Sequence, residues 1–344
     1  MAYTDIDKPT DYFNTVIYAG TGSSHAITVG FQPDWVWIKN RDAGNDHNSY
    51  DSIRGATKDL NNNTTNAEST IAEGLKSFDS NGFTVGTNTA HNGGSENYVS
   101  WNWLAGGTGA SNTVGDINST VSANTTSGFS IVSYTGTGSN ATVGHGLGTT
   151  PKVVIVKNRT SAENWQVYHG SISGMSGGYI TLNNTDGFLT NITNFWNGDH
   201  SSTVIDIGSN NGTNQSGNSL IAYCFAEKKG FSKFGSYTGN GNADGTFVYT
   251  GFKPAFIISK NIDDGTRNWN IWDNKRLGYN FDNERLYANL SNAESSENVV
   301  DILSNGYKFR NTGTDYNASG QTFIYMAFAE NPFVTSTSIP CTAR

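Results

Sequence analysis

Short apolar runs separated by polar turns make up this chain, and one such run occurs three times in nearly the same form. Each copy begins near a proline, continues through Val, Ile, Trp or Phe, and ends in Lys-Asn; the copies are residues 30–40, 146–158 and 251–261. Runs rich in β-branched and aromatic residues and bounded by Gly, Asn, Asp and Ser are typical of strands. The sequence therefore predicts a β-strand at each copy and a module that repeats along the chain.

The repeat extends well beyond this strand. Each copy has a Gly-rich turn before it, an Asn-Gly or Asp-Gly turn after it, and an alternating aromatic strand at its end. Lys157 and Lys260 are separated by the same number of residues as Phe225 and Phe328, so the second and third blocks align with little net insertion. The Gly-rich turns are at 18–22, 134–138 and 237–241, and the closing strands are at 99–103, 220–225 and 323–328.

These patterns predict an all-β protein of three tandem β-sandwich domains of the lectin-like or jelly-roll kind, because alternating strands bury one face against a second sheet. A segment of Gly, Ser, Thr and Asn between the first two blocks is predicted to be an exposed linker. The predicted boundaries are 1–11 for an N-terminal lead, 12–107 for the first module, 108–127 for the linker, 128–230 for the second module, 231–334 for the third module and 335–344 for a C-terminal tail.

Composition narrows the class of protein. Charged residues are only 15% of the 344, Gly numbers 40, and the formal net charge is −8. Nucleic acid is therefore not an expected partner, because phosphate binding needs clustered Lys and Arg, and the longest basic run is Lys228-Lys229. No apolar stretch is long enough to span a bilayer, and the first residues have no signal-peptide pattern. Synthesis in a cytoplasm is expected, with Cys224 and Cys341 as free thiols.

A charge-poor all-β chain that folds in a cytoplasm without disulfides fits a virion protein, and the first block carries a more specific likeness. The stretches 7–15, 30–41, 51–58, 77–83 and 98–103 resemble the repeated lectin-like (concanavalin A-like) modules of structural and tail-fibre-like virion proteins of tailed phages of marine bacteria and cyanobacteria. This resemblance implies lectin-like sandwich folds and location in the virion of a bacteriophage. It brings no catalytic residues to this chain.

Repeated acidic residues are the first place to look for chemistry, because glycosidases use paired carboxylates. Glu227 and Glu330 are at matched positions after the closing strands, and we interpret them as strand-end charges. Asp51 and Asp273 also match, but the second block has His169 there, which suggests a solvated position. With no second repeated acid and no nucleophile pattern, we expect that the protein is not an enzyme.

Metal and cofactor sites have weak support in the sequence. None of the six histidines has the spacing of a zinc site, and surface loops are their expected location. Calcium remains a possible ligand, because lectin-like sandwiches often bind it through loop oxygens; the candidates are Asp42, Asn45 and Asp46, and the pair Asp263-Asp264. The prediction is no metal site and no cofactor.

A tryptophan in a predicted loop is the best ligand-binding candidate. Trp196 lies between Asn194, Asn197 and Asp199, and an exposed indole beside amide and carboxylate groups can stack on a sugar while its neighbours bond the hydroxyls. The alternative, a loop tryptophan folded back onto the sandwich or into a subunit contact, stays open.

Two functional hypotheses of different classes follow. In the first, the protein is a tail-fibre-like or appendage protein that adheres to host-surface saccharide; in the second, it is a capsid decoration or cement protein, with a glycan depolymerase as a distant third. We expect other virion proteins as partners, and a homo-oligomer with a trimer as the leading prediction. The tail from Asn331 to Arg344 is expected to reach a neighbouring chain.

Overall fold

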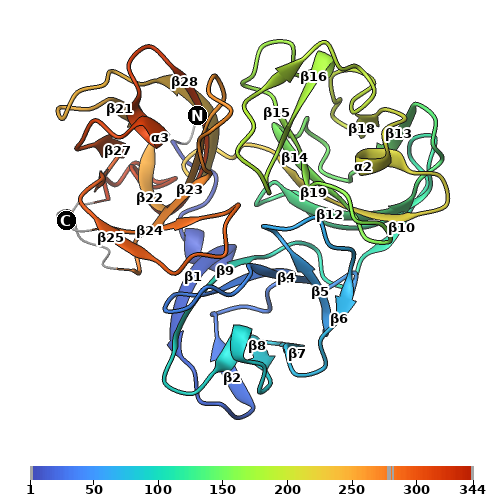
Figure 1. The fold of residues 1–344 in the computed structure, drawn as a ribbon, viewed down its shortest axis with the longest axis horizontal. Coiled ribbons are helices and arrows are strands. Elements are labelled where there is room, and N and C mark those ends of the chain that lie inside the picture. Colours follow the sequence, from blue (N-terminus) through green and yellow to red (C-terminus); the bar gives the residue numbers. More distant parts are fainter. Residues whose placement is uncertain (1–2, 277–279, 281–282, 342–344) are drawn as a thin grey trace.

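The computed structural model shows an all-β protein in which three lobes surround a common centre (Figure 1). It describes residues 3–276, 280 and 283–341. Lobe 1 contains the strands up to residue 103, lobe 2 those from 110 to 225, and lobe 3 those from 232 to 332. In each lobe a large antiparallel sheet is accompanied by a smaller one. The all-β prediction is confirmed, whereas the division into three tandem domains stays a prediction.

Lobe 1 has sheets of six and three strands, with a 3₁₀ turn before them and one short helix. In spatial order the large sheet is β1 (Phe13–Ala19), β9 (Asn97–Trp103), β3 (Trp35–Asn40), β4 (Asn48–Asp51), β5 (Lys58–Asn61) and β6 (Ser69–Thr70). The small sheet is β2 (His25–Thr28), β8 (Gly82–Val85) and β7 (Leu75–Asp79); η1 is Pro9–Asp11 and α1 is Thr89–Asn92.

Lobe 2 has sheets of eight and two strands. The large sheet is β10 (Ala110–Asn112), β11 (Ser119–Asn124), β12 (Phe129–Thr135), β19 (Ser219–Phe225), β14 (Val153–Asn158), β15 (Gln166–His169), β16 (Gly178–Thr181) and β17 (Leu189–Thr190). The small sheet is β13 (Ala141–Gly144) and β18 (Val204–Ile207); η2 is Met175–Gly177 and α2 is Asn211–Asn214.

Lobe 3 repeats the order of lobe 1. Its large sheet is β20 (Ser232–Thr238), β28 (Thr322–Pro332), β22 (Phe252–Asn261), β23 (Asn270–Asp273), β24 (Asn283–Tyr287) and β25 (Ser295–Glu297). The small sheet is β21 (Phe247–Tyr249), β27 (Gly306–Phe309) and β26 (Val300–Leu303), and α3 is Thr314–Asn317.

The strand that ends in Lys-Asn is buried on both faces, as β3 illustrates. Side chains alternate along a strand, so Trp35 and Trp37 point to one side of the sheet and Val36 and Ile38 to the other. The two tryptophans belong to a core shared by all three lobes. Val36 and Ile38 instead pack with Phe83 and other residues of the small sheet, in a core of lobe 1 alone. Strand β3 is therefore apolar at consecutive positions because its two faces contact two different cores.

Three aromatic side chains at equivalent positions of the closing strands meet at the centre of the molecule. The ring centroids are 6.4 Å apart for Trp103 and Phe225, 5.8 Å for Phe225 and Phe328, and 5.7 Å for Trp103 and Phe328. Each comes from a different lobe, and all three are almost fully buried. The large sheets thus turn their inner faces toward one another, in a shared core around this triangle. The three lobes lie around a common centre (Figure 1).

The predicted exposed linker at 108–127 is wrong, because this segment joins the large sheet of lobe 2. Strand β11 pairs along its length with β12, and β10 pairs with β11. Ile117 and Val121 are buried in the shared core. Apolar Val121 and Ala123 alternate with polar Thr120, Ser122 and Asn124, and this period-2 pattern is hidden by the abundance of Gly, Ser and Thr around it.

Each Gly-rich turn packs against the end of the short helix in its own lobe, and the three contacts, which we call joints, are equivalent. Asn92, Asn214 and Asn317, which end the short helices, accept a hydrogen bond from the backbone N–H of Thr21, Thr137 and Asn240, respectively. The glycine before each turn lies against the segment after the helix, and a Cβ on Gly20 would stand 2.0 Å from the carbonyl oxygen of Gly93. Only glycine permits this approach.

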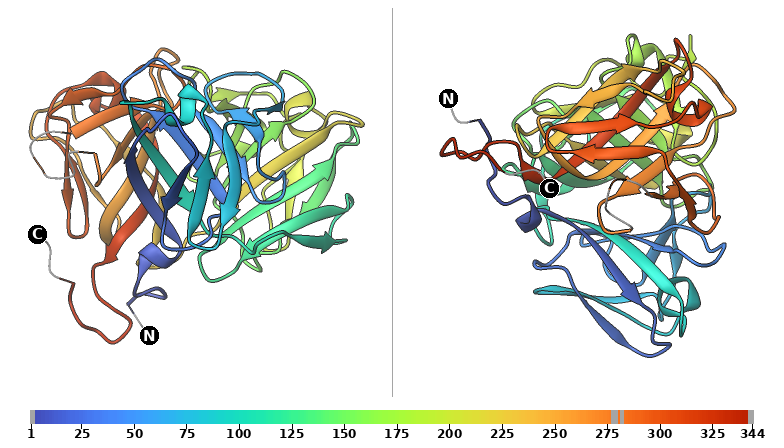
Figure 2. Two further views of the ribbon diagram at one scale, coloured as in Figure 1. Left: turned by 90° about the horizontal axis from the view of Figure 1, so that it is seen from below. Right: turned by 90° about the vertical axis from the view of Figure 1, so that its left-hand side faces the viewer.

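The two ends of the described chain lie side by side and project from the same side of the body (Figure 2). Asp7 accepts hydrogen bonds from the backbone N–H and the hydroxyl of Ser336, and these bonds lower the pKa of Asp7. The rings of Tyr3 and Phe333 are in contact, and an isolated bridge joins Val334 to Pro340. The part of the predicted tail up to residue 341 therefore packs on the N-terminal lead of its own chain; whether it also contacts another chain stays a prediction.

Candidate functional site

Trp196 is not exposed, contrary to the sequence prediction. Only 1% of its surface is accessible, and it packs into the core with Tyr168 and His200, whose rings lie 5.5 Å from the indole. Its position matches the alternative interpretation, in which the loop tryptophan folds back onto the sandwich. Within the part of the chain that the structure describes, its indole N–H has no hydrogen-bond partner. Tyr168 in turn donates to Asp199 at 3.0 Å, so the predicted Asp199 supports this aromatic cluster.

Trp196 and Asn197 nevertheless line a shallow surface groove of about 430 Å³ at the edge of lobe 2. The groove also contains Asn140, Ser176 and Thr193 together with Gly177 and Gly198. Asn140 donates to the side-chain oxygen of Asn197 at 2.6 Å, which fixes both amides. Asn194 and Asp199 are exposed nearby but are not part of the lining. The structure thus brings together two of the four predicted residues, with amides and hydroxyls around them.

The positions matched to Asp51 and Asp273 are not solvated, which corrects the prediction. Both carboxylates are buried, and each pairs with the arginine three residues later, Arg54 or Arg276, whose side chains are fully buried. Each also accepts a hydrogen bond from another lobe: Tyr223 donates to Asp51 at 2.7 Å, and Trp101 donates to Asp273 at 3.1 Å. Burial raises the pKa of Tyr223 well above its usual value.

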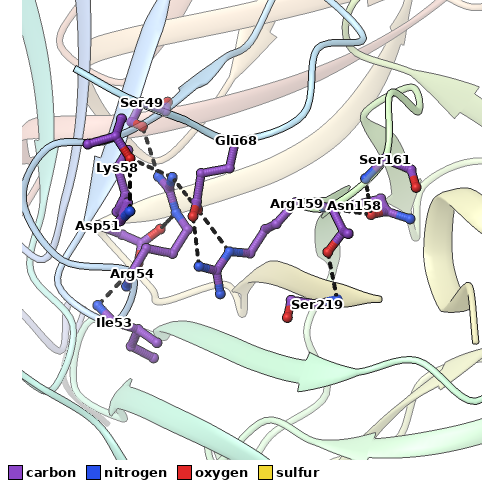
Figure 3. A network of polar contacts seen from close by, with 12 residues as sticks. Ser49, Asp51, Ile53, Arg54, Lys58, Glu68, Asn158, Arg159, Ser161 and Ser219 are labelled. Carbon is purple, nitrogen blue, oxygen red and sulfur yellow. Dashed lines mark hydrogen bonds and ion pairs between the residues drawn. The ribbon is translucent and has the colours of Figure 1, made fainter. Parts of the chain in front are cut away.

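Two such networks lie at two of the boundaries between lobes, which we call seams. At the seam of lobes 1 and 2, Glu68 contacts Arg54 at 3.3 Å and accepts a bidentate pair of hydrogen bonds from Arg159, at 2.8 and 2.9 Å (Figure 3). Burial opposes ionisation of Glu68, but the bonds from Arg159 and the charge of Arg54 prevail and lower its pKa. A bidentate arginine is the geometry that best satisfies a carboxylate taken from water.

The seam of lobes 3 and 1 repeats this arrangement. The carboxylate of Glu294 contacts Arg276 at 3.4 Å and accepts two hydrogen bonds from the guanidinium of Arg41, at 2.8 and 2.6 Å. The backbone N–H of Glu294 donates to the carbonyl of Arg41, just as that of Glu68 donates to Arg159, both at 2.8 Å. Arg41 and Arg159 directly follow the repeated Lys-Asn, so the motif places them alike.

The seam of lobes 2 and 3 has the same backbone hydrogen bond, but apolar side chains replace the glutamate and the arginine. Phe188 donates its N–H to the carbonyl of Ile262 at 2.7 Å, and Ile262 follows the third Lys-Asn. Ile172 stands where the other lobes have Arg54 and Arg276. The side chains of Ile172, Phe188 and Ile262 pack on the shared core. His169 replaces the aspartate and bonds to the carbonyl of Tyr325 at 3.1 Å. This explains the swap seen in the sequence.

The Lys-Asn repeat itself is structural. Asn40, Asn158 and Asn261 each accept the backbone N–H groups two and three residues later, which forms the turn after the strand. Lys157 and Lys260 are buried, and each donates to a carbonyl of the preceding lobe, that of Thr65 at 3.0 Å or of Thr185 at 2.8 Å. Burial lowers the pKa of each of these lysines to about 8.

The remaining candidates have structural partners. Glu227 follows strand β19 and pairs with Lys233, as the prediction of a strand-end charge has it. Glu330 pairs with Lys253 but lies within strand β28, so it is not beyond the end of its strand. Asp42 accepts from Asn97, and Asp264 pairs with Arg267. In residues 3–276, 280 and 283–341, no group of three or more His, Cys, Asp or Glu could hold a metal ion.

The predicted surface histidines are mostly interior. His47, His91, His145, His169 and His200 are buried, and burial lowers the pKa of each of them. His91, for example, contacts the hydroxyl of Tyr50 at 2.8 Å. Cys224 and Cys341 are free thiols, as predicted, and Cys224 is buried. Of the helices that the structure describes, none is long and apolar enough to cross a membrane.

Fold and seams together define an all-β, sandwich-like protein whose three lobes share one interior. Residues 8–332 match the model of a family described as Domain of unknown function (DUF7483), and the chain belongs to this family. The match runs through all three lobes. A comparison with curated proteins found no match.

Proposed function

We propose that this protein is a non-enzymatic structural protein of a tailed-phage virion, a tail-fibre-like or appendage protein of three tandem lectin-like sandwiches that adheres to host-surface glycans. The placement in a virion rests on the likeness of the first block to phage modules. The observation that carries the adhesion is the groove beside Trp196, where amide and hydroxyl groups gather over a buried indole. Such a lining suits a neutral sugar, whose hydroxyls need hydrogen-bond donors and acceptors.

The seams support a role in which the body is held rigid. Buried charge networks and a common aromatic centre fix the lobes relative to one another. A binding surface on such a body loses little freedom when it meets a ligand. A single sugar contact is weak, and several copies on one particle raise the avidity without new contacts. A homotrimer, other virion proteins as partners, and the absence of a cofactor or metal remain part of this proposal.

The test is adsorption of the purified protein to host cells. Asn197→Ala and Asn140→Ala remove groove amides without a core cavity and are expected to reduce adsorption several-fold. Equal unfolding midpoints of the two asparagine variants and the wild type show that the fold is retained. Asn66→Ala, at an exposed position of lobe 1, is the control. Unchanged adsorption by both groove variants would remove this groove from the function, and release of reducing ends from host polysaccharide would refute the non-enzymatic claim.

A capsid decoration or cement protein is the second candidate. The observation that favours it is the exposed Ile339, 62% accessible at the tip of the projecting terminal segment. An exposed apolar side chain on a projecting segment suits a protein contact. Failure of the wild-type protein to adsorb to cells, together with its binding to particles that lack it, would favour this role.

A further inference from the structure

A second pocket lies where the N-terminal lead crosses the junction of lobes 2 and 3. Its volume is about 460 Å³, within the range of small-molecule sites. Three segments far apart in the sequence build it, and its lining includes Tyr3, Glu227, Lys228, Lys229, Lys233 and Tyr249. Lys228-Lys229 is the basic run noted in the sequence, which the groove in lobe 2 does not involve.

Specific contacts hold this pocket together. The hydroxyl of Thr4 and the backbone N–H of Asp5 both bond to the carbonyl of Lys229, at 3.0 and 3.2 Å, which fixes the lead over the junction. The hydroxyls of Tyr3 and Tyr249 are 2.9 Å apart and join the lead to strand β21. The backbone N–H of Lys228 donates to the hydroxyl of Ser232 at 2.9 Å. The pocket is therefore a feature of the folded chain and not of a free terminus.

Charge and aromatic surface in this pocket indicate a ligand. Three lysines and one glutamate line it, in a protein whose formal net charge is −8. Lys233 pairs with Glu227 at 3.4 Å, and the ammonium of Lys229 lies 5.2 Å from the centre of the Tyr3 ring. Tyr249 is 54% exposed, an unusual state for so large an aromatic side chain. A locally positive, aromatic-lined pocket on an acidic protein favours an anionic ligand with an apolar face.

We propose that this pocket binds a carboxylated saccharide of the uronate class. The exposed ring of Tyr249 provides a stacking face for the sugar, and the ammonium of Lys228 pairs with its carboxylate. Glu227 accepts hydrogen bonds from sugar hydroxyls, and its negative charge repels a doubly charged phosphate more strongly than a singly charged carboxylate. This site is separate from the groove beside Trp196, and the inference does not depend on that proposal.

The experiment is calorimetric titration of the full chain with tetragalacturonate, and with maltotetraose as the neutral probe of similar size. We expect binding of the acidic probe only, and weaker binding at high salt because exposed charges are screened. Lys228→Gln is expected to weaken binding roughly tenfold, the loss of one charge-assisted hydrogen bond, and Tyr249→Ala about three- to tenfold. Lys76→Gln removes an exposed lysine paired with Glu73 in lobe 1 and is the matched control.

Each result decides the proposal. Loss of affinity in the two pocket variants, with the control equal to wild type, supports it. Equal affinity for both probes, equal affinity of all three variants, tighter binding of inorganic phosphate, or no binding of tetragalacturonate overturns it. Adsorption to host cells that is lost in Asn197→Ala and kept in Lys228→Gln would leave the groove proposal standing when this one fails. Equal unfolding midpoints of Tyr249→Ala and wild type exclude a folding defect.

Discussion

Arg54 and Arg276 occupy the same place in two different lobes, and each is fully buried against an aspartate three residues earlier in the chain. Each also contacts a glutamate that binds an arginine of the next lobe, Arg159 for one and Arg41 for the other. Lobe 1 thus contacts lobe 2, and lobe 3 contacts lobe 1, through an equivalent set of four charged residues: one aspartate, one glutamate and two arginines. A head-to-tail contact that closes after three units leaves no unpaired interface, which is the usual logic of a ring of subunits. Here one chain contains the whole ring.

Breaking the first network should be costly. In Arg54→Met, Asp51 and Glu68 lose a buried partner, and we expect the free energy of unfolding to fall by about 3–5 kcal/mol. Urea denaturation measures it. Arg310→Met removes an ion pair with Asp301 in which the arginine is 45% exposed, and this control should change stability by less than about 1 kcal/mol. Similar losses in both variants would show that the seam network does not stabilise the ring.

The apolar seam should accept the charges of the other two. Phe188→Glu or Ile262→Arg alone places an unpaired charge at the seam, and each is expected to lower the free energy of unfolding by about 1–3 kcal/mol. The double variant recreates the pair formed by Glu68 and Arg159, so part of the loss should be recovered. A double-mutant cycle gives the coupling, for which we expect at least about 0.5 kcal/mol in favour of the pair. Strict additivity would mean that the two positions are not equivalent to that pair.

Stability should fall on the acid side of neutrality because buried histidines must bind protons when the chain unfolds. Burial lowers the pKa of His169 to about 4, below the ordinary value of 6.5. Between these values the unfolded chain binds more protons than the folded one, so stability rises with pH across this window and is lost as the pH falls from 6.5 towards 4.

His169→Gln tests this directly, because glutamine keeps a donor for the carbonyl of Tyr325 but does not titrate. From pH 6.5 to 4.5 the wild type should lose stability more steeply than the variant, by up to about 1.4 kcal/mol per pH unit. Urea denaturation at several pH values measures both slopes. Parallel curves would show that His169 does not contribute to acid sensitivity.

Any side chain at Gly20, in the first Gly-rich turn, should destabilise the protein. In Gly20→Ala the new Cβ would stand 2.0 Å from the carbonyl oxygen of Gly93, and the turn must move, so we expect a loss of about 1–3 kcal/mol. Gly94→Ala is the matched control, since no atom lies within 4 Å of its Cβ and its φ is not in the left-handed region. Thermal unfolding compares the two. A stable Gly20→Ala would show that the close approach is not required.

The sequence determined the strands and their repetition. Prolines, Lys-Asn ends, Asn-Gly turns and alternating aromatics mark local structure, and local structure depends on residues close together in the chain. The free cysteines and the position of Glu227 beyond the end of its strand were likewise predicted. The weak alternation around Val121 was masked by its Gly, Ser and Thr neighbours, and the short helices that end in Asn92, Asn214 and Asn317 contain too few residues to show a period.

Tertiary structure alone decided which faces are buried. Asp51 looked solvated because the second block has His169 at the matched position, yet Arg54 and, from the next lobe, Tyr223 satisfy the carboxylate inside the protein. Trp196 looked exposed because its neighbours are polar, yet it packs between Tyr168 and His200. The sequence shows three similar blocks; only the closed ring, with Trp103, Phe225 and Phe328 meeting at its centre, turns the inner face of every block into interior. For these three rings the burial comes from segments about a hundred residues or more away, and no local pattern can report it.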